Sequence, residues 1–169
     1  MAADAKFAPV FARARQGGLG SLAHAGEASG PESVTGALDL YGARRIGHGT
    51  RSVEDPRLLA RLAREGIPLE VCPTSNVRLN VVPSVAAHPV TRFLAAGVPV
   101  IVSSDDPSLF GTDLLAEYEV LHREAGVPLA TLGRSALGSF DAALVSEGER
   151  RERFADARAA ARAWIEELP

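Results

Sequence analysis

Four short apolar runs of the sequence each end in polar residues of the types that carry out catalysis. The polar residues are 24–27 (HAGE), 47–49 (GHG), 72–76 (CPTSN) and 103–107 (SSDDP). Histidine and aspartate are good zinc ligands. Metal-assisted hydrolysis also needs an acid that delivers a proton and a base that orients or deprotonates a water. The residue types at these four points therefore predict a metal-dependent hydrolytic site.

Each of these signals has a simpler interpretation when it is taken alone. A single histidine at a strand end is more often a hydrogen-bonded structural residue than a ligand. The Gly-His-Gly triplet could be a turn, Glu27 could be loop polarity, and Cys72 could be a small core residue. One of Asp105 and Asp106 could be the N-cap of a helix that starts at Pro107. Adjacent carboxylates repel unless a cation neutralises one of them, so the combination carries the prediction.

The spacing of the motifs indicates the elements that must position them. His24, His48 and Cys72 each close an apolar run, and they are 24 residues apart. This period fits one strand plus one helix of a parallel α/β protein, in which catalytic residues lie where the strands end. A complete (β/α)8 barrel needs about 250 residues, so 169 residues predict half of a barrel or a small open sheet. The expected strands are 19–24, 44–48, 68–72 and 98–104.

Helices are expected between and after these strands. The expected ranges are 8–17, 31–42, 55–66, 88–97, 113–126, 128–140 and 147–168. Pro31 and Pro56 favour first-turn positions, Asp55 an N-cap, and Gly42 the position just after a helix. In the last helix, an apolar stripe that includes Phe154, Trp164 and Leu168 predicts a face packed on a core.

The four motifs, in this order and spacing, closely resemble the C-terminal half of adenosine deaminases, which are metal-dependent (β/α)8 barrels of the amidohydrolase type. The resemblance extends over nearly the whole chain and includes GARRIGHG, EDPRLLARLA and the FGTDL stretch. It implies that residues 1–169 form a single partial domain of the α/β class. That domain would be the C-terminal half of a TIM-type barrel, with about four parallel strands plus C-terminal helices.

The same resemblance implies a role for five residues. His24 matches the third zinc-binding histidine, and Asp105 matches the aspartate on zinc. Glu27 matches the glutamate that protonates N1 of the purine, and His48 matches the histidine that orients and deprotonates the attacking water. Asp106 matches the aspartate that accepts a hydrogen bond related to purine N7. The implied reaction converts adenosine or deoxyadenosine to inosine and ammonia with a water activated by Zn2+.

The sequence departs from the family pattern at the metal site. The family's first two zinc ligands form a His-x-His pair, whereas no two of His24, His48, His88 and His122 are separated by one residue. We expect His88 to be structural or exposed and His122 to lie on the surface. Since a catalytic zinc site normally has at least three protein ligands, we expect the chain to be inactive alone. A missing N-terminal half or a second copy of the chain are the expected partners.

Two further alternatives stay open. Many relatives carry Asn shortly before DDP, where this chain has Val102-Ser103-Ser104. This difference favours another adenine-containing substrate, such as aminodeoxyfutalosine or adenine. A half barrel also exposes two sheet edges, so the chain could instead be a non-catalytic fragment or an assembly partner.

The composition bounds the partners and the location. The net charge is −3 and no block of Lys or Arg occurs, which disfavours nucleic acid as a partner. Cys72 is the only cysteine, so an internal disulfide is impossible, which fits a reducing cytosol. No apolar run approaches the about 20 residues of a membrane span, and the first residues carry no leader pattern. We therefore expect a cytoplasmic protein that does not bind membranes.

Overall fold

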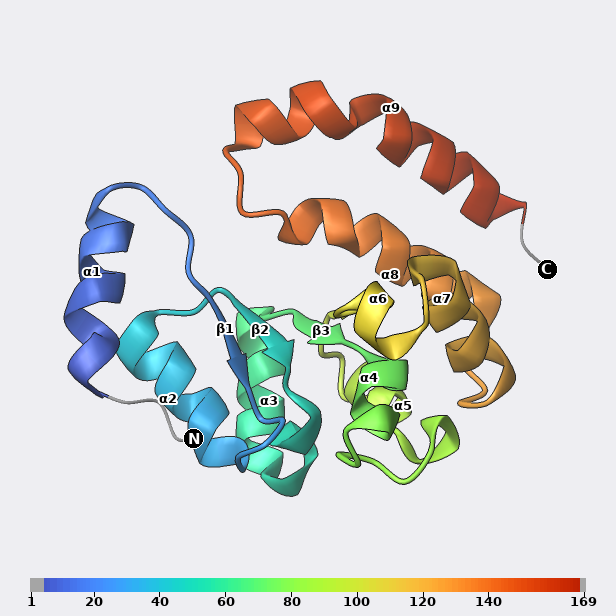
Figure 1. The fold of residues 1–169 in the computed structure, drawn as a ribbon. Coiled ribbons are helices and arrows are strands. Elements are labelled where there is room, and N and C mark those ends of the chain that lie inside the picture. The colour runs from blue at the N-terminus through green and yellow to red at the C-terminus, as the bar shows by residue number, and fades with distance from the viewer. Residues whose placement is uncertain (1–4, 168–169) are drawn as a thin grey trace.

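A four-stranded parallel sheet forms the centre of the molecule. The computed structural model describes residues 5–167, and Figure 1 shows the order of its elements. The strands are β1 (Leu22–Ala25), β2 (Arg45–His48), β3 (Leu69–Val71) and β4 (Val100–Val102), and they lie side by side in sequence order. Because all three pairings are parallel, the strands end at the same edge of the sheet. The predicted parallel α/β architecture is thus confirmed.

Helices connect the strands and follow the last of them. They are α1 (Ala8–Gln16), α2 (Pro31–Tyr41), α3 (Pro56–Glu65), α4 (Pro73–Arg78), α5 (Val90–Ala95), α6 (Pro107–Phe110), α7 (Leu114–Arg123), α8 (Leu129–Ala142) and α9 (Glu147–Glu166). Short 3-10 helices span Ala5–Phe7, Thr50–Glu54 and Val85–Ala87. Between residues 5 and 167, no helix is both long and apolar enough to cross a membrane.

The predicted helix boundaries are confirmed where the sequence carries capping residues. The Asp55 side chain accepts hydrogen bonds from the amides of Arg57 and Leu58, so it caps α3. Helix α2 begins at Pro31 and ends before Gly42, whose φ of 60° places it in the left-handed region. Glycine adopts this conformation without steric strain, which is why it ends helices so often.

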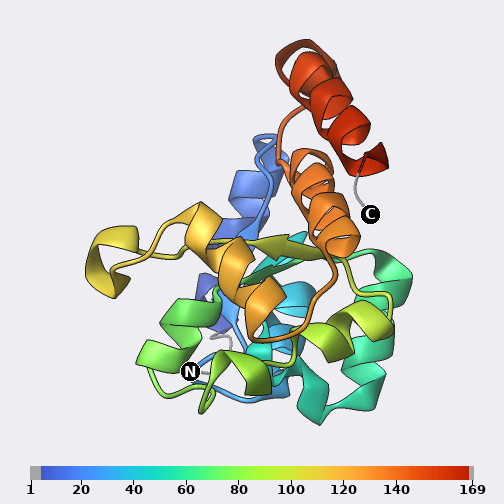
Figure 2. The ribbon, with the colours of Figure 1, turned by 90° about the vertical axis from the view of Figure 1, so that its right-hand side faces the viewer.

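The hydrophobic core lies on one face of the sheet. Side chains alternate between the two faces of a strand, and one set is buried against the helices. The core combines strand residues with residues of α2, α3, α5, α7 and α8: Ile46, Leu69, Val71, Val100, Val102, Val34, Leu38, Leu58, Leu62, Phe93, Leu121 and Leu132. Figure 2 shows α2, α3 and α5 together on one side of the sheet. The opposite face carries His24 and the ion pair between Arg45 and Glu70, whose Nε and Oε1 atoms are 2.9 Å apart.

Both outer strands keep one unpaired side. Within residues 5–167, β1 pairs only with β2, and β4 pairs only with β3. An unpaired strand presents backbone N–H and C=O groups that can pair with another strand. The edge of β1 is therefore open to a further strand, whereas on β4 the Val100 carbonyl already accepts a 2.5 Å hydrogen bond from Oγ of Ser135 in α8.

The last helix differs from its prediction. None of the described residues of α9 is buried, and Trp164 is 55% exposed. Figures 1 and 2 both show α9 at the outer end of the molecule. It packs on α8, with the rings of Phe140 and Phe154 5.4 Å apart between centroids. Leu168, the last residue of the predicted stripe, lies outside the described residues. The stripe is therefore only partly covered, because Phe154 and Ile165 are half-buried against α8 whereas Trp164 stays exposed.

Candidate metal-hydrolytic site

The side chains of His24 and His48 meet at the ends of β1 and β2. His24 lies beside Gly47 in the parallel register, and its Nδ1 is 3.2 Å from Nε2 of His48. A Cβ atom on residue 47 would lie 2.9 Å from Cδ2 of His24. The glycine before His48 therefore leaves the space in which the His24 imidazole lies.

His48 lies at the centre of the candidate site. It is 1% exposed, and its backbone has a φ of 62°, which is uncommon for any residue other than glycine. Its Nδ1 lies 3.3 Å from Nδ2 of Asn76 and 3.5 Å from Oε1 of Glu27. Burial lowers the pKa of His48, although the charges of Glu27 and Asp105 oppose this shift. His48 is thus held largely as the neutral imidazole, in a strained backbone conformation of the kind that clusters at functional sites.

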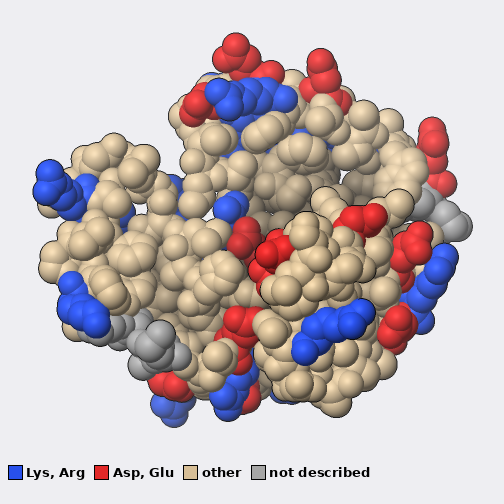
Figure 3. Space-filling model, in the orientation of Figure 1, with Lys and Arg blue, Asp and Glu red and all other residues tan. Residues whose placement is uncertain are grey.

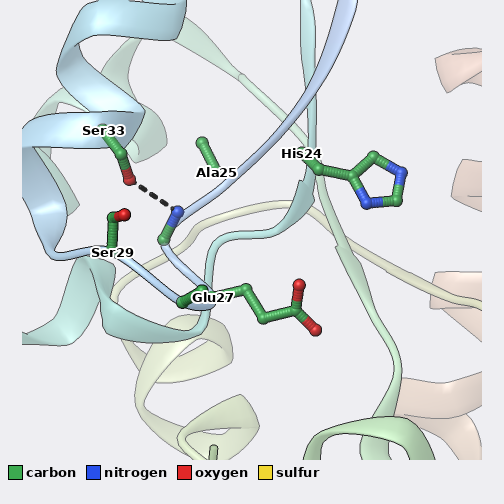
Figure 4. A pocket seen from close by; sticks show the side chains of 7 residues that line it. His24, Ala25, Glu27, Ser29 and Ser33 are labelled. Carbon is green, nitrogen blue, oxygen red and sulfur yellow. Dashed lines mark hydrogen bonds between the residues drawn. The ribbon is translucent and has the colours of Figure 1, made fainter. Parts of the chain in front are cut away.

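Glu27 follows β1 in a loop fixed by the start of α2. The Gly26 amide donates to Oγ of Ser33 at 2.8 Å, and Ser33 donates to the carbonyl of Gly30 at 2.7 Å. In Figure 4, the Glu27 carboxylate and the His24 imidazole extend to the same side of this loop. Oε1 of Glu27 is buried and has no hydrogen-bond partner among the described residues. Such an atom is suited to bind a ligand, because an unpaired buried oxygen is costly.

An open hollow of about 90 Å³ adjoins this loop and is lined by residues 24–29 and Ser33. Pockets for small molecules usually span about 300–1,000 Å³. The hollow is therefore well below the size of a substrate pocket, and further walls would have to come from elsewhere. In Figure 3, acidic side chains line the hollowed centre of the face shown, whereas Lys and Arg lie mainly around the rim.

Asp105 approaches the same centre from the end of β4. Its φ of 57° makes it a second site residue in the left-handed region, and its Oδ2 accepts a 2.6 Å hydrogen bond from Ser75. Ligand atoms of His48, Cys72 and Asp105 all lie within 4.8 Å of one another. With His24 beside His48, imidazole nitrogen and carboxylate oxygen are available as donors, and zinc accepts both types. The donor set therefore fits a transition-metal ion such as zinc.

Asp106 does not converge with the other predicted site residues. Its Oδ1 accepts from the amide of Leu109 at 3.0 Å, and Asp106 is the exposed N-cap of α6. The simpler interpretation of the Asp-Asp-Pro motif, that one aspartate starts a helix, is thus confirmed for Asp106. The two adjacent aspartates therefore have different roles in the structure: Asp105 lies beside His48 and Cys72, whereas Asp106 caps α6. A contact between Asp106 and a purine stays a prediction.

Cys72 combines the core role expected for it with a place in the cluster. It is 4% exposed, and burial together with the Asp105 charge raises the pKa of its thiol to about 12. The thiol is therefore protonated and unreactive at neutral pH.

The remaining two histidines differ from each other. His122 is exposed, as predicted, with Nδ1 2.9 Å from the carbonyl of Val127. His88 is 3% exposed, so its expected structural role holds and the exposed alternative is wrong.

Two buried residues that support the site carried no distinct sequence signal. Asn76 is completely buried beneath His48. Glu117 of α7 is completely buried too, and its carboxylate accepts from the amide of Thr74 at 3.0 Å and from Oγ1 of Thr112 at 2.6 Å. Glu117 thereby ties α7 to the start of α4, a helix that was not predicted and that begins directly after Cys72. Asn76 ends the CPTSN motif and Glu117 lies three residues after the FGTDL stretch, and only the tertiary contacts give either residue a function.

Comparison with known proteins places the chain in a family. The family model for adenosine deaminase matches residues 2–157. The chain is 47% identical over 151 residues to an aminodeoxyfutalosine deaminase of Streptomyces coelicolor, a match that covers 89% of this chain and 39% of the relative. Among solved structures, it is similar to the adenine deaminase of Arthrobacter aurescens, with a TM-score of 0.88 and 35% identity over 96% of this chain and 48% of that one.

A second solved structure bears on the metal. An amidohydrolase of Burkholderia ambifaria with bound zinc matches with a TM-score of 0.80 and 28% identity, over 94% of this chain and 46% of that one. The chain thus spans less than half the length of each of these three proteins. Its four parallel strands correspond to part of their TIM-type barrels. The chain belongs to the adenosine deaminase family and forms a partial barrel of that fold.

Proposed function

We propose that this chain supplies half of the active site of a metal-dependent deaminase for an adenine-containing small molecule. In the reaction, water replaces the exocyclic amino group of the purine, and ammonia leaves. The observation that carries the proposal is that three chemically suited side chains lie around His48 at the ends of the strands: His24 and Glu27 from β1 and Asp105 from β4.

His24 and Asp105 are the residues that would hold a metal ion, and zinc is the ion that the zinc-containing structural relative supports. A bound zinc ion supplies Lewis acidity, which lowers the pKa of water toward neutrality. His48 lies between these two residues and orients the attacking water. Glu27 presents a carboxyl oxygen without a partner among the described residues, which suits it to give a proton to N1 of the purine. Asp106 uses Oδ1 to cap α6, which leaves Oδ2 for a contact near N7.

The relatives bear on the choice of substrate. The two deaminases compared above that carry a substrate in their names are an aminodeoxyfutalosine deaminase and an adenine deaminase. They support these two substrates ahead of adenosine, which the sequence motifs placed first. The Val102-Ser103-Ser104 stretch before Asp105 is in accord with this order.

We further propose that the rest of a barrel completes the site. The unpaired sides of β1 and β4 are where its strands would add, and on β4 a new strand would replace the hydrogen bond from Ser135 to the Val100 carbonyl. A catalytic zinc normally has at least three protein ligands, and His24 and Asp105 supply two. The chain on its own is then inactive, and its partner provides the missing ligands and the remaining wall of the substrate pocket.

A chimeric enzyme tests this proposal. The segment of the Streptomyces coelicolor deaminase that matches this chain is replaced by the chain, and deamination of aminodeoxyfutalosine, adenine and adenosine is followed by ammonia release. We expect activity on at least one substrate and a loss of about 100-fold or more in Glu27→Gln. Glu124→Gln, which changes an exposed carboxylate on the α7 C-cap, should leave activity unchanged. A folded, zinc-loaded chimera that deaminates none of the three would refute the proposal.

A further inference from the structure

A network of buried hydrogen bonds lies behind His48 and ends at His88. Thr50, Asn76 and His88 are each at most 4% exposed. Oδ1 of Asn76 lies 2.9 Å from Oγ1 of Thr50 and 3.2 Å from Nε2 of His88, and Nδ2 of Asn76 lies 3.3 Å from Nδ1 of His48. The network thus connects the loop before α5 to the centre of the candidate site.

The backbone fixes where His88 carries its proton. The Val90 amide donates to Nδ1 of His88 at 3.2 Å, so this nitrogen is unprotonated. A neutral imidazole has one N–H donor and one acceptor nitrogen. The proton is therefore on Nε2, which donates to Oδ1 of Asn76. Burial, together with the nearby His48, lowers the pKa of His88 to about 4, which keeps this ring neutral at physiological pH.

The orientation of the Asn76 amide follows from its two donors. Thr50 and His88 both donate to Oδ1, which can accept two hydrogen bonds. If the amide were reversed, its NH2 group would face the N–H of His88, so that hydrogen bond would be replaced by a contact between two donors, while the Thr50 hydroxyl could turn to accept. The NH2 group of Asn76 must then face His48, where it donates to Nδ1.

We propose that His88 is a positioning residue which, through Asn76, holds neutral His48 in the tautomer that carries its proton on Nε2. This nitrogen faces His24. Nδ1 of His48 is occupied by the Asn76 donor, which explains why Oε1 of Glu27, 3.5 Å away, receives no hydrogen bond from it. The hydrogen bonds that lead from the Val90 amide through His88 and Asn76 to His48 thus allow one arrangement of protons. In this arrangement Nε2 of His48, which faces His24, carries the hydrogen.

What this tautomer would mean for catalysis rests on the proposed function. In a deaminase, His48 would donate its Nε2 hydrogen to the attacking oxygen and so orient it. It could not accept a proton at the same nitrogen while it stays in this tautomer. The role of proton acceptor that the family resemblance implies for His48 would pass to a group other than this nitrogen.

Imidazole nitrogen NMR on the 169-residue chain tests the tautomer directly. The four histidines are labelled with nitrogen-15, and long-range proton–nitrogen correlations are recorded in mildly alkaline solution, where histidine is neutral. We expect His48 to show a protonated Nε2 and an unprotonated Nδ1. A protonated Nδ1 in His48 would overturn the proposal without any variant. The readout needs no activity, so this inference and the proposed function fail independently.

Variants test whether His88 controls this tautomer. In His88→Leu the network loses one donor to Asn76, and we expect His48 to gain a population protonated on Nδ1. His88→Gln supplies an amide donor and should restore the wild-type pattern, while His122→Gln should have no effect. Should the leucine variant not fold, Asn76→Asp gives a second test, because a carboxylate only accepts and draws the His48 proton to Nδ1. An unchanged His48 in folded His88→Leu or Asn76→Asp, or a glutamine variant that behaves like leucine, contradicts the proposal.

Discussion

Nδ1 of His24 and Nε2 of His48 lie 3.2 Å apart although the two residues are on neighbouring strands and 24 positions apart in the chain. The register sets His24 beside Gly47, and the missing side chain at that position gives the imidazole its space. The Gly-His-Gly motif therefore does more than form a turn. Its first glycine positions the histidine of the preceding strand.

Gly47→Ala should displace His24 while leaving the fold intact. The new Cβ would lie 2.9 Å from Cδ2 of an exposed ring that can move aside. We expect the free energy of unfolding to change by less than about 1 kcal/mol and the zinc affinity of the chimera to fall by about 10–100-fold. Gly138→Ala is the matched control, because open space surrounds that position in α8. An equal loss of affinity in both variants would show that His24 placement is not the cause.

Glu117 should contribute to stability although it lies outside the reacting centre. Glu117→Ala removes the acceptor of the Thr74 amide and of the Thr112 hydroxyl, so two donors lose their partner. Leaving a buried donor unpaired costs about 1–3 kcal/mol, and we expect urea unfolding to show a total loss in the upper part of this range. Glu119→Gln alters an exposed carboxylate of the same helix and should change stability by less than about 0.5 kcal/mol. Similar losses in both would contradict the role assigned to Glu117.

The buried, neutral His88 makes stability depend on pH. The unfolded chain protonates this residue near the ordinary pKa of 6.5, whereas the folded chain protonates it only at about 4. Between these values the unfolded state binds more protons, so stability falls as the pH falls from 6.5 toward 4. The full effect is about 3 kcal/mol at about 1.4 kcal/mol per pH unit. In urea titrations across this range, His88→Gln should lose this part of the slope, and an unchanged slope would contradict the expectation.

The sequence predicted the elements that are determined by local chemistry. Pro31, Pro56 and Asp55 start helices, and Gly42 ends one, through contacts within a few residues. The short helix α4 was missed because it begins directly at a motif that was interpreted by its polarity, whereas α6 was foreseen as the simpler interpretation of the Asp-Asp-Pro motif. Helix α9 was assigned a buried face because periodicity shows that a stripe exists and not what covers it.

The candidate site likewise contains residues that could be identified from the sequence and residues that only the structure reveals. His24, Glu27, His48 and Asp105 could be chosen because their types and strand-end positions are visible in the sequence. The orientation of Asp106 toward the α6 amides could not be separated from a substrate role in advance, since both use the same carboxylate. The network through Asn76 and His88 joins segments that have no common periodicity, and only the folded chain reveals it.

Zinc content tests the central claim most directly, namely that the chain carries two ligands of a site that needs a further part. The purified 169-residue chain and the chimera are compared by elemental analysis, alongside His24→Ala in the chimera. We predict far less than one zinc per molecule in the isolated chain, about one in the chimera, and loss of that zinc in His24→Ala. One zinc per isolated chain together with deaminase turnover would contradict the account, because the chain would then complete the site without a partner.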